Sequence, residues 1–312
     1  MRLVLFWLRR RQRNTFLKKL KSKQNVSQEI LGTTPFFVSA FDTDTRSIIE
    51  EGIPSFESLL SILHEVKSRQ GESTTSEIAV DVGANYGSYS VLFSRSFGKV
   101  ISFEAHPTTF KVLELNVTQL RNIEVKAMAI SSHQGTALIH EYRANHSGSA
   151  SLEDLREMNK TPLRSYPVEK STLDIQLQSI ASSIGLIKID VEGHELEVLQ
   201  GAHKILSESK PTLIFEHNTG DKEVLDFLKN HGYITFYVPS SELIKAYANR
   251  FQLIQYLRKL RNPVIGMWKL YSNKFLVEFT VESLPKCELV LSFHKDRFPR
   301  GNHPIKDYNS IP

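Results

Sequence analysis

Short apolar runs alternate with helix-like periodicity over most of the chain from residue 77 onward. The apolar runs, short enough for buried strands, are 78–82, 100–103, 125–130, 186–189, 213–215, 234–238 and 288–294. The segments with apolar residues at helical spacing are 89–97, 109–120, 195–206 and 222–230. This alternation predicts an α/β fold with a mostly parallel sheet and helices on both faces. Such sheets bind ligands outside the carboxyl ends of their strands.

The alternating region is expected to form one domain at 77–298. Before it, residues 25–76 contain one amphipathic helical pattern and are predicted to be a covering segment. Near its end the alternation breaks at 240–285, where we predict a helical insertion before the last strand. Residues 299–312 are rich in proline and polar residues and are expected to form an irregular tail.

The positive charge of the chain is concentrated at its N-terminus. The 312 residues include 39 Lys and Arg against 34 Asp and Glu, a formal charge of +5. Nine of the basic residues and none of the acidic ones lie in residues 1–24, so the rest of the chain is net negative. A net negative body does not suit a broad phosphate-binding face, and no nucleic-acid partner is expected. The single cysteine, Cys287, excludes an intrachain disulfide and a cysteine-rich zinc site.

Residues 1–24 form a basic amphipathic arm. Its apolar run at residues 3–8 is far shorter than the ~20 apolar residues that span a bilayer. The charges follow this run, whereas in a secretory signal they precede a longer one. We therefore expect a cytoplasmic protein. The arm suits a helix lying peripherally on an anionic membrane surface, and a solvated terminus is an equally good interpretation.

A turn with two glycines follows the first predicted strand. It reads Asp81-Val-Gly83-Ala-Asn85-Tyr-Gly87 and leads into a helical segment. Glycine allows a sharp turn and a close approach of the backbone to a ligand. A carboxylate at the start of such a turn repels a phosphate and favours a cationic ligand, such as S-adenosylmethionine.

An acidic residue ends the second predicted strand. Glu104 follows Gly83 by 21 residues, where an acid can accept hydrogen bonds from the ribose hydroxyls of an adenosine group. The turn and this acid together predict an S-adenosylmethionine site formed by Asp81, Gly83, Asn85, Gly87 and Glu104. A nucleotide-dependent Rossmann oxidoreductase is an alternative, but the turn lacks the three-glycine pattern that binds pyrophosphate.

Further acidic residues end the next core strands. Asp190 follows the run at 186–189, and Glu216 and Asn218 follow the run at 213–215. Carboxylates that converge in one crevice require a shared cation or proton. Asp190 and Glu216 are therefore candidate catalytic residues. Lys188 is expected to pair with an acid.

The segment after Asp190 supplies a candidate base. His194 is chosen because imidazole titrates near neutral pH and can take a proton from an acceptor hydroxyl. Glu192 and Glu195 either join the acidic cluster or cap the helix that begins near His194, and both interpretations are open. Asp174 is expected at a helix N-terminus.

Four segments together resemble the FkbM family of methyltransferases. They are 80–87, 103–107, 171–174 and the string Ile187-Lys-Ile-Asp-Val-Glu-Gly-His-Glu195 with Val198-Leu-Gln-Gly-Ala202 after it. The resemblance implies a class I Rossmann-like fold, an S-adenosylmethionine cofactor and O-methylation of a hydroxyl on a sugar, glycan or polyketide-like acceptor. By analogy, Asp190, Glu216 and Asn218 are similar to the Mg²⁺ ligands of catechol-type O-methyltransferases. A non-catalytic membrane-surface module that binds S-adenosylmethionine is the remaining alternative.

Overall fold

The computed structural model describes residues 77–142, 150–152, 161–217, 222–238, 277–278 and 287–297. The arm at 1–24, the covering segment at 25–76 and the tail at 299–312 lie outside the described residues, and so does Asn218. Only residues 277–278 of the expected insertion at 240–285 are described.

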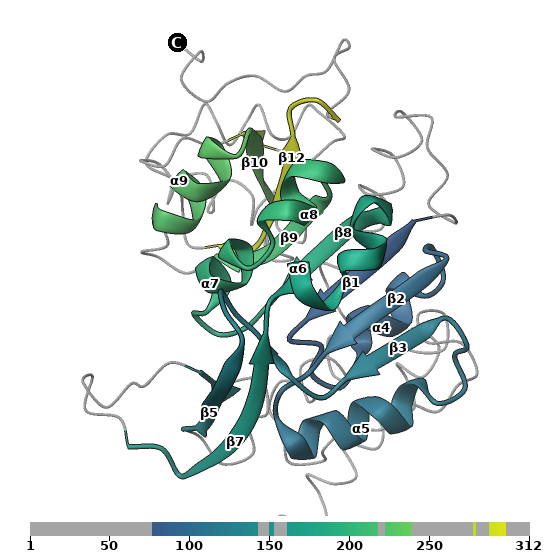
Figure 1. The fold of residues 1–312 in the computed structure, drawn as a ribbon, viewed down its shortest axis with the longest axis vertical. Helices are drawn as coiled ribbons and strands as arrows, with labels where there is room; N and C mark the ends of the chain where they lie inside the picture. The colour runs from purple at the N-terminus through teal and green to yellow at the C-terminus, as the bar shows by residue number, and fades with distance from the viewer. Residues whose placement is uncertain are drawn as a thin grey trace, which may run out of the picture.

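A large, mostly parallel sheet forms the centre of this domain (Figure 1). Its strands are β1 (Ile78–Val82), β2 (Lys99–Phe103), β3 (Ile123–Lys126), β8 (Ile184–Ile189), β9 (Thr212–His217), β10 (Tyr233–Val238), β11 (Val277–Glu278) and β12 (Cys287–His294). They lie in the order β11-β10-β12-β9-β8-β1-β2-β3. The five strands from β9 to β3 are parallel, whereas β12 runs antiparallel to both of its neighbours. The predicted α/β class is confirmed.

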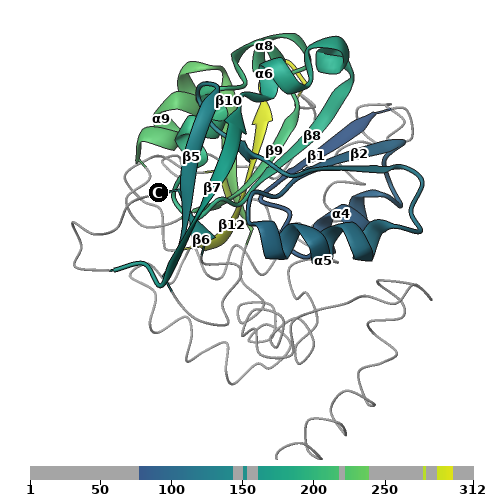
Figure 2. The same ribbon diagram turned by 60° about the horizontal axis from the view of Figure 1, so that its bottom comes forward.

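Helices cover both faces of the sheet (Figure 2). The helices on one face are α4 (Ser88–Phe93) and α5 (Pro107–Val117), and those on the other are α6 (Leu173–Gln176), α7 (Glu195–Gln200), α8 (His203–Glu208) and α9 (Lys222–Asn230). A 3-10 helix, η4 (Gln178–Ser183), follows α6. Among the described helices, none has the length and hydrophobicity of a membrane-spanning segment.

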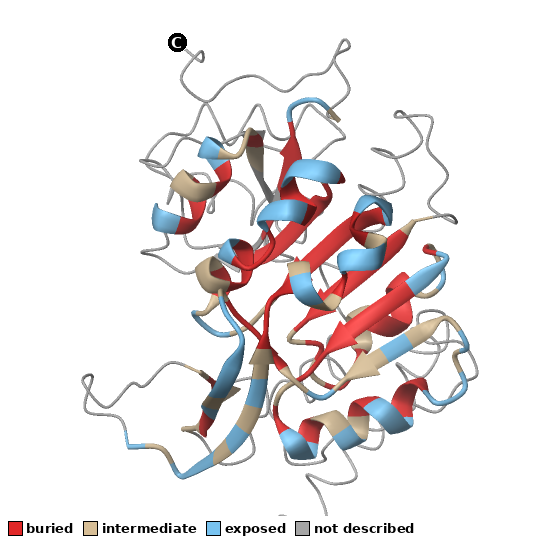
Figure 3. Ribbon diagram, in the orientation of Figure 1, coloured by how far each residue is buried: buried red, intermediate tan, exposed pale blue. Residues whose placement is uncertain are grey.

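The central parallel strands and the inner sides of the helices form the core (Figure 3). All residues of β1 and β8 are buried, which accounts for their near-continuous apolar sequences, because both faces of these strands are covered. Two residues interrupt these apolar sequences, Asp81 in β1 and Lys188 in β8, and both are charged and buried. These two residues are adjacent in the register of β1 and β8.

A second, four-stranded sheet lies near the carboxyl ends of the parallel strands (Figure 1). Its strands are β4 (Ala129–Ile130), β5 (Gly135–Glu141), β6 (Ala150–Ser151) and β7 (Arg164–Ser171), in the order β4-β7-β5-β6. The single strand predicted at 125–130 is therefore wrong. A tight turn, in which Met128 N donates to Lys126 O, moves the chain from β3 in the large sheet to β4 in the small one.

The single helix predicted at 195–206 is two helices, α7 and α8, separated at Gly201 and Ala202. A Cβ atom at Gly201 would lie 2.1 Å from the carbonyl oxygen of Ser131, so the chain passes very close to the small sheet here. Asp174 lies in the first turn of α6, as predicted. Its carboxylate also accepts hydrogen bonds from the backbone N–H groups of Lys204 and Ile205 in the first turn of α8.

Candidate active site

A cavity of about 350 Å³ lies at the carboxyl ends of β1, β2 and β8. The sheet reverses its strand order at β1, which lies between β2 on one side and β8 on the other. Such a switch point is where open α/β sheets bind ligands, and the volume falls in the range of small-molecule pockets. The cavity is therefore the candidate active site.

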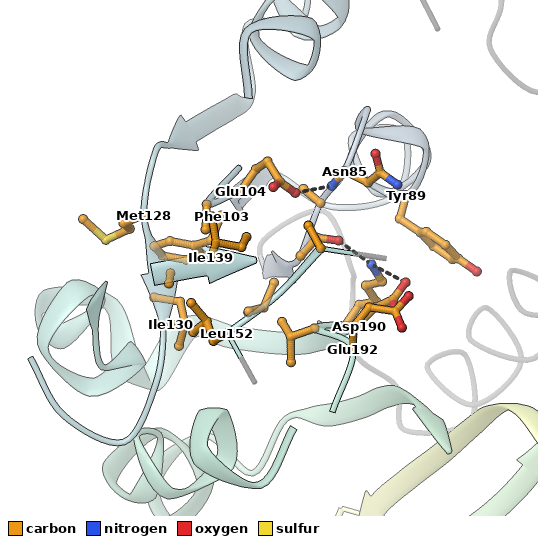
Figure 4. A pocket seen from close by; sticks show the side chains of 18 of the residues that line it. Asn85, Tyr89, Phe103, Glu104, Met128, Ile130, Ile139, Leu152, Asp190 and Glu192 are labelled. Carbon is orange, nitrogen blue, oxygen red and sulfur yellow. Dashed lines mark hydrogen bonds and ion pairs between the residues drawn. The ribbon is translucent and has the colours of Figure 1, made fainter. Parts of the chain in front are cut away.

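The cavity has two chemically different ends (Figure 4). The side chains that form its apolar end are Phe103, Met128, Ile130, Ile139 and Leu152. Those at its acidic end are Asp190 and Glu192, with Tyr89 near them. One ligand that fills the cavity would need an apolar part and a part that tolerates negative charge.

The Glu104 carboxylate is held in the cavity wall by two backbone groups. Asn85 N donates to Oε2 and His106 N donates to Oε1, each at 2.8 Å. Asn85 has a positive φ of 50°, which is uncommon outside glycine and directs its N–H toward Glu104. Burial raises the pKa of Glu104 to about 7, although these hydrogen bonds and the charge of Lys188 lower it. Each oxygen keeps a lone pair for a ligand hydroxyl.

The first glycine of the turn is required by the close approach of two strands. Gly83 has a φ of +72°, and a Cβ atom there would lie 1.8 Å from the carbonyl oxygen of Asp190. Its N–H and that of Ala84 both donate to Phe103 O, which joins the turn to the end of β2. Gly87 has a φ of 90° and precedes α4 as its N-cap, but it does not line the cavity.

Lys188 connects three parts of the site. Its Nζ donates to Gly83 O at 2.9 Å and lies 3.3 Å from both Asp81 Oδ1 and Asp190 Oδ2. Burial lowers the pKa of Lys188, but the carboxylates of Asp190 and Asp81 raise it above its ordinary value. The lysine is thus protonated at neutral pH and paired with acids, as the sequence predicted.

Asp81 lies behind the cavity wall. Its side chain is fully buried and absent from the cavity lining, and its Oδ2 accepts a hydrogen bond from Ser90 Oγ at 2.6 Å. Its Oδ1 faces Lys188 Nζ as an ion pair. The sequence predicted that Asp81 contacts a cationic ligand directly. In this position its side chain does not line the cavity. Asp81 instead holds Lys188 in place.

The predicted residues after β8 lie in different places. Asp190 and Glu192 line the cavity, and the Glu192 carbonyl accepts a hydrogen bond from Ser151 Oγ at 2.8 Å. Glu195 Oε1 lies 3.3 Å from the backbone nitrogens of Val191 and Gly193, which donate to it and shape the loop before α7.

His194 does not line the cavity. Its Nε2 lies 3.0 Å from Ser131 Oγ, and its Nδ1 lies 3.6 Å from Glu197 Oε2. The contact with Ser131 links the loop after β8 to the small sheet.

The predicted metal ligands are only partly described. The backbone of Glu216 lies in β9, next to β8, and Asn218 lies outside the described residues. In the described part of the chain, no three His, Cys, Asp or Glu side chains form a group that could hold a metal ion. A divalent ion bound by Asp190, Glu216 and Asn218 stays a prediction.

Sequence reasoning missed the wall that the small sheet contributes. Ile139 of β5 and Leu152, just after β6, line the cavity together with Met128 and Ile130. The strand-like sequence of β5 was the only available signal. With this wall, the cavity fits S-adenosylmethionine: the apolar end suits an adenine ring, Glu104 suits the ribose, and the acidic end suits a cationic group.

Comparisons with known proteins identify the family to which the chain is similar. The Methyltransferase FkbM domain family matches residues 81–235, about half of the chain. Methyltransferase sdnD of Sordaria araneosa is 28% identical over an alignment that covers 39% of this chain and 59% of that protein. The chain therefore spans less than two thirds of this relative.

Two solved structures are also similar. Methyltransferase FkbM from Methylobacillus flagellatus KT has a TM-score of 0.42 and 15% identity, over 80% of this chain and 60% of that one. A SAM-dependent methyltransferase from Aquifex aeolicus has a TM-score of 0.32 and 16% identity, over 62% of this chain and 86% of that one.

Proposed function

Because the chain belongs to the FkbM methyltransferase family, we propose that it is an S-adenosylmethionine-dependent O-methyltransferase. The proposed acceptor is a hydroxyl group of a sugar, glycan or polyketide-like molecule. The bound cofactor would supply an electrophilic methyl group on its sulfonium. The single observation that carries the proposal is the buried Glu104 carboxylate, held by two backbone N–H groups at the wall of the cavity.

We assign cofactor binding to the apolar end and to the turn after β1. Glu104 accepts hydrogen bonds from the ribose hydroxyls, and Phe103, Met128 and Ile130 contact the adenine ring. The turn from Gly83 to Asn85 fits closely around the ligand because it carries little side-chain bulk. Asp81 and Gly87 act indirectly: one anchors Lys188, and the other allows the turn into α4.

We assign acceptor binding to the acidic end. Asp190 lines the cavity and has a partly exposed carboxylate, so it can accept a hydrogen bond from the acceptor hydroxyl and orient its oxygen. Lys188 pairs with this carboxylate and limits its rotation. Glu216 is proposed to assist from the end of β9, with Asn218, directly or through a divalent ion.

The proton of the acceptor hydroxyl needs a receiving group. Asp190 is our first candidate because it lines the cavity, and His194 is the second because it does not. The two are separated by their pH profiles: His194→Ala flattens the acid limb of the profile only if the imidazole is the base. A wild-type profile in His194→Ala would exclude the imidazole as the base and leave Asp190 or a metal-bound alkoxide.

The proposal is tested by incubating the full chain with methyl-labelled S-adenosylmethionine and a cell-derived pool of glycans and lipid-linked sugars. The expected product carries one additional methyl group. Its formation should fall at least tenfold in Asp190→Asn, and in Glu104→Ala at cofactor concentrations below the dissociation constant. If the wild-type chain binds the cofactor and methylates nothing in this pool or in a pool of polyketide-like hydroxy compounds, the non-catalytic binding module is the better account.

We also propose that residues 1–24 contact an anionic membrane surface. The nine cations would attract the surface and the apolar run at 3–8 would insert at the headgroup level. Deletion of 1–24 should abolish sedimentation with anionic vesicles and leave cofactor affinity unchanged, and high salt should weaken the full chain's sedimentation. Equal sedimentation of both proteins would show that the arm is a solvated terminus.

A further inference from the structure

Two histidines outside the cavity lie side by side, one at the start of α8 and one just after the end of α9. His203 is the first residue of α8, and His231 follows the end of α9. His231 Nε2 lies 3.3 Å from His203 Nδ1. The ring of Phe227 stacks on the ring of His231, with centroids 4.0 Å apart, and lies 5.5 Å from the ring of His203. Phe227 therefore supports both imidazoles.

The hydrogen bonds of His231 show which of its ring nitrogens presents a lone pair to His203. Its Nδ1 lies 2.8 Å from the carbonyl oxygen of Phe227. A carbonyl can only accept, so Nδ1 carries the hydrogen, and in the neutral ring Nε2 directs a lone pair toward His203. Histidines that bind metals usually donate their other ring N–H to a carbonyl or carboxylate in this way.

The separation of the two nitrogens suits a shared ion. Two imidazole nitrogens that each lie about 2.0–2.1 Å from one metal, at angles between square and tetrahedral, are roughly 3 Å apart. The observed 3.3 Å between the two nitrogens is therefore compatible with a shared ion. Without an ion, His203 Nδ1 donates a hydrogen bond to His231 Nε2. An ion would replace this hydrogen, and His203 would then carry its hydrogen on Nε2. His203 is exposed, so an ion can reach the pair from solvent.

We propose that His203 and His231 form a binding site for a divalent transition-metal ion, with water completing the coordination. Imidazole ligands select Cu²⁺, Ni²⁺ or Zn²⁺ and discriminate against Mg²⁺, which prefers oxygen. The bound ion would join the start of α8 to the end of α9 and would stabilise the native state, since the pair is not formed in the unfolded chain. Stimulation by such metals would then not require an ion at Asp190.

The proposal is tested by calorimetry and thermal unfolding of the full chain with Ni²⁺, Cu²⁺ and Mg²⁺. Ni²⁺ and Cu²⁺ should bind the wild-type chain and raise its unfolding temperature, Cu²⁺ should bind more tightly than Ni²⁺, and Mg²⁺ should not occupy the site. His203→Ala should weaken Ni²⁺ binding at this site by at least about tenfold, because one of two protein ligands is lost. His133→Ala is the matched control: His133 is also exposed and contacts Ser132 and Lys170 instead.

A spectroscopic measurement separates direct ligation from a general stabilising effect. The Cu²⁺ complex should show hyperfine coupling to two imidazole nitrogens in the wild-type chain and in His133→Ala, and this pattern should be lost in His203→Ala. His231→Ala should behave likewise, but it also removes the bond to Phe227, so His203→Ala decides. Unchanged Ni²⁺ affinity and an unchanged Cu²⁺ spectrum in His203→Ala would overturn the proposal.

Discussion

Two carboxylates that line the cavity, Glu104 and Asp190, are held in different ways. Glu104 is bound by two backbone N–H groups, and burial raises its pKa to about 7. Asp190 is more exposed and is paired with the ammonium of Lys188. The negative charge of Glu104 is therefore only partly stabilised until a ligand donates hydrogen bonds to it. The negative charge of Asp190, in contrast, always has the ammonium of Lys188 as its counter-ion. This difference suits the separate roles that we propose, Glu104 in cofactor binding and Asp190 in acceptor binding.

The largest effect is expected when the permanent counter-ion is removed. Lys188→Met leaves Asp81 buried without its cationic partner and should lower the free energy of unfolding by about 3–5 kcal/mol. The double variant Asp81→Asn and Lys188→Met should recover much of this loss. Denaturant unfolding measures both. If Lys188→Met is as stable as wild type, the ion pair does not hold the acidic end together.

A smaller effect is expected for the carboxylate itself. Asp190→Asn should reduce methyl transfer at least tenfold, about 1.4 kcal/mol in the barrier, and should change cofactor affinity by much less. Turnover and calorimetric titration of the same protein provide the two values. Equal losses in both would place Asp190 in the cofactor site and would remove the contrast with Glu104.

A further effect is the pH dependence of stability that Glu104 causes. Its pKa is raised from 4.5 to about 7, so the native state holds its proton more tightly than the unfolded chain. The stabilising contribution of the protonated group is complete below pH 4.5 and is lost as pH rises through about 7. The free energy of unfolding should therefore fall more steeply over this interval in wild type than in Glu104→Gln.

The same ionisation affects cofactor binding with the opposite sign. Hydrogen bonds from the ribose hydroxyls favour the carboxylate form of Glu104, so cofactor binding below pH 7 should release a proton. The affinity for the cofactor should fall by less than tenfold for each unit by which the pH is lowered. Calorimetry in two buffers of different ionisation enthalpy measures this release. The release should be absent in Glu104→Gln and present in Asp190→Asn, and its presence in Glu104→Gln would assign it to another group.

The parallel core could be predicted from the sequence because its strands are buried on both faces. The run at 78–82 was predicted with its observed bounds, and so was the helix at 222–230. The small sheet could not be predicted: β7 has mostly exposed or half-buried residues and contains Pro167, which is unusual within a strand.

The sequence indicated which types of residue the site contains, but not which of the predicted side chains line the cavity. Glu104 and Asp190 reach the cavity because strand ends of a parallel sheet share one edge. The burial of Asp81 and the contact of His194 with Ser131 depend on packing between distant segments, which no local pattern encodes. The break at Gly201 likewise follows from the close approach of the small sheet.

The most direct test of the account is the affinity of S-adenosylmethionine for Glu104→Ala, measured by titration calorimetry beside wild type and Asp190→Asn. Loss of two hydrogen bonds to a charged group, each worth about 1.5–3 kcal/mol, should weaken binding at least tenfold in Glu104→Ala. Asp190→Asn should bind close to wild type. Unchanged affinity in a folded Glu104→Ala protein would contradict the assignment of this cavity as the cofactor site.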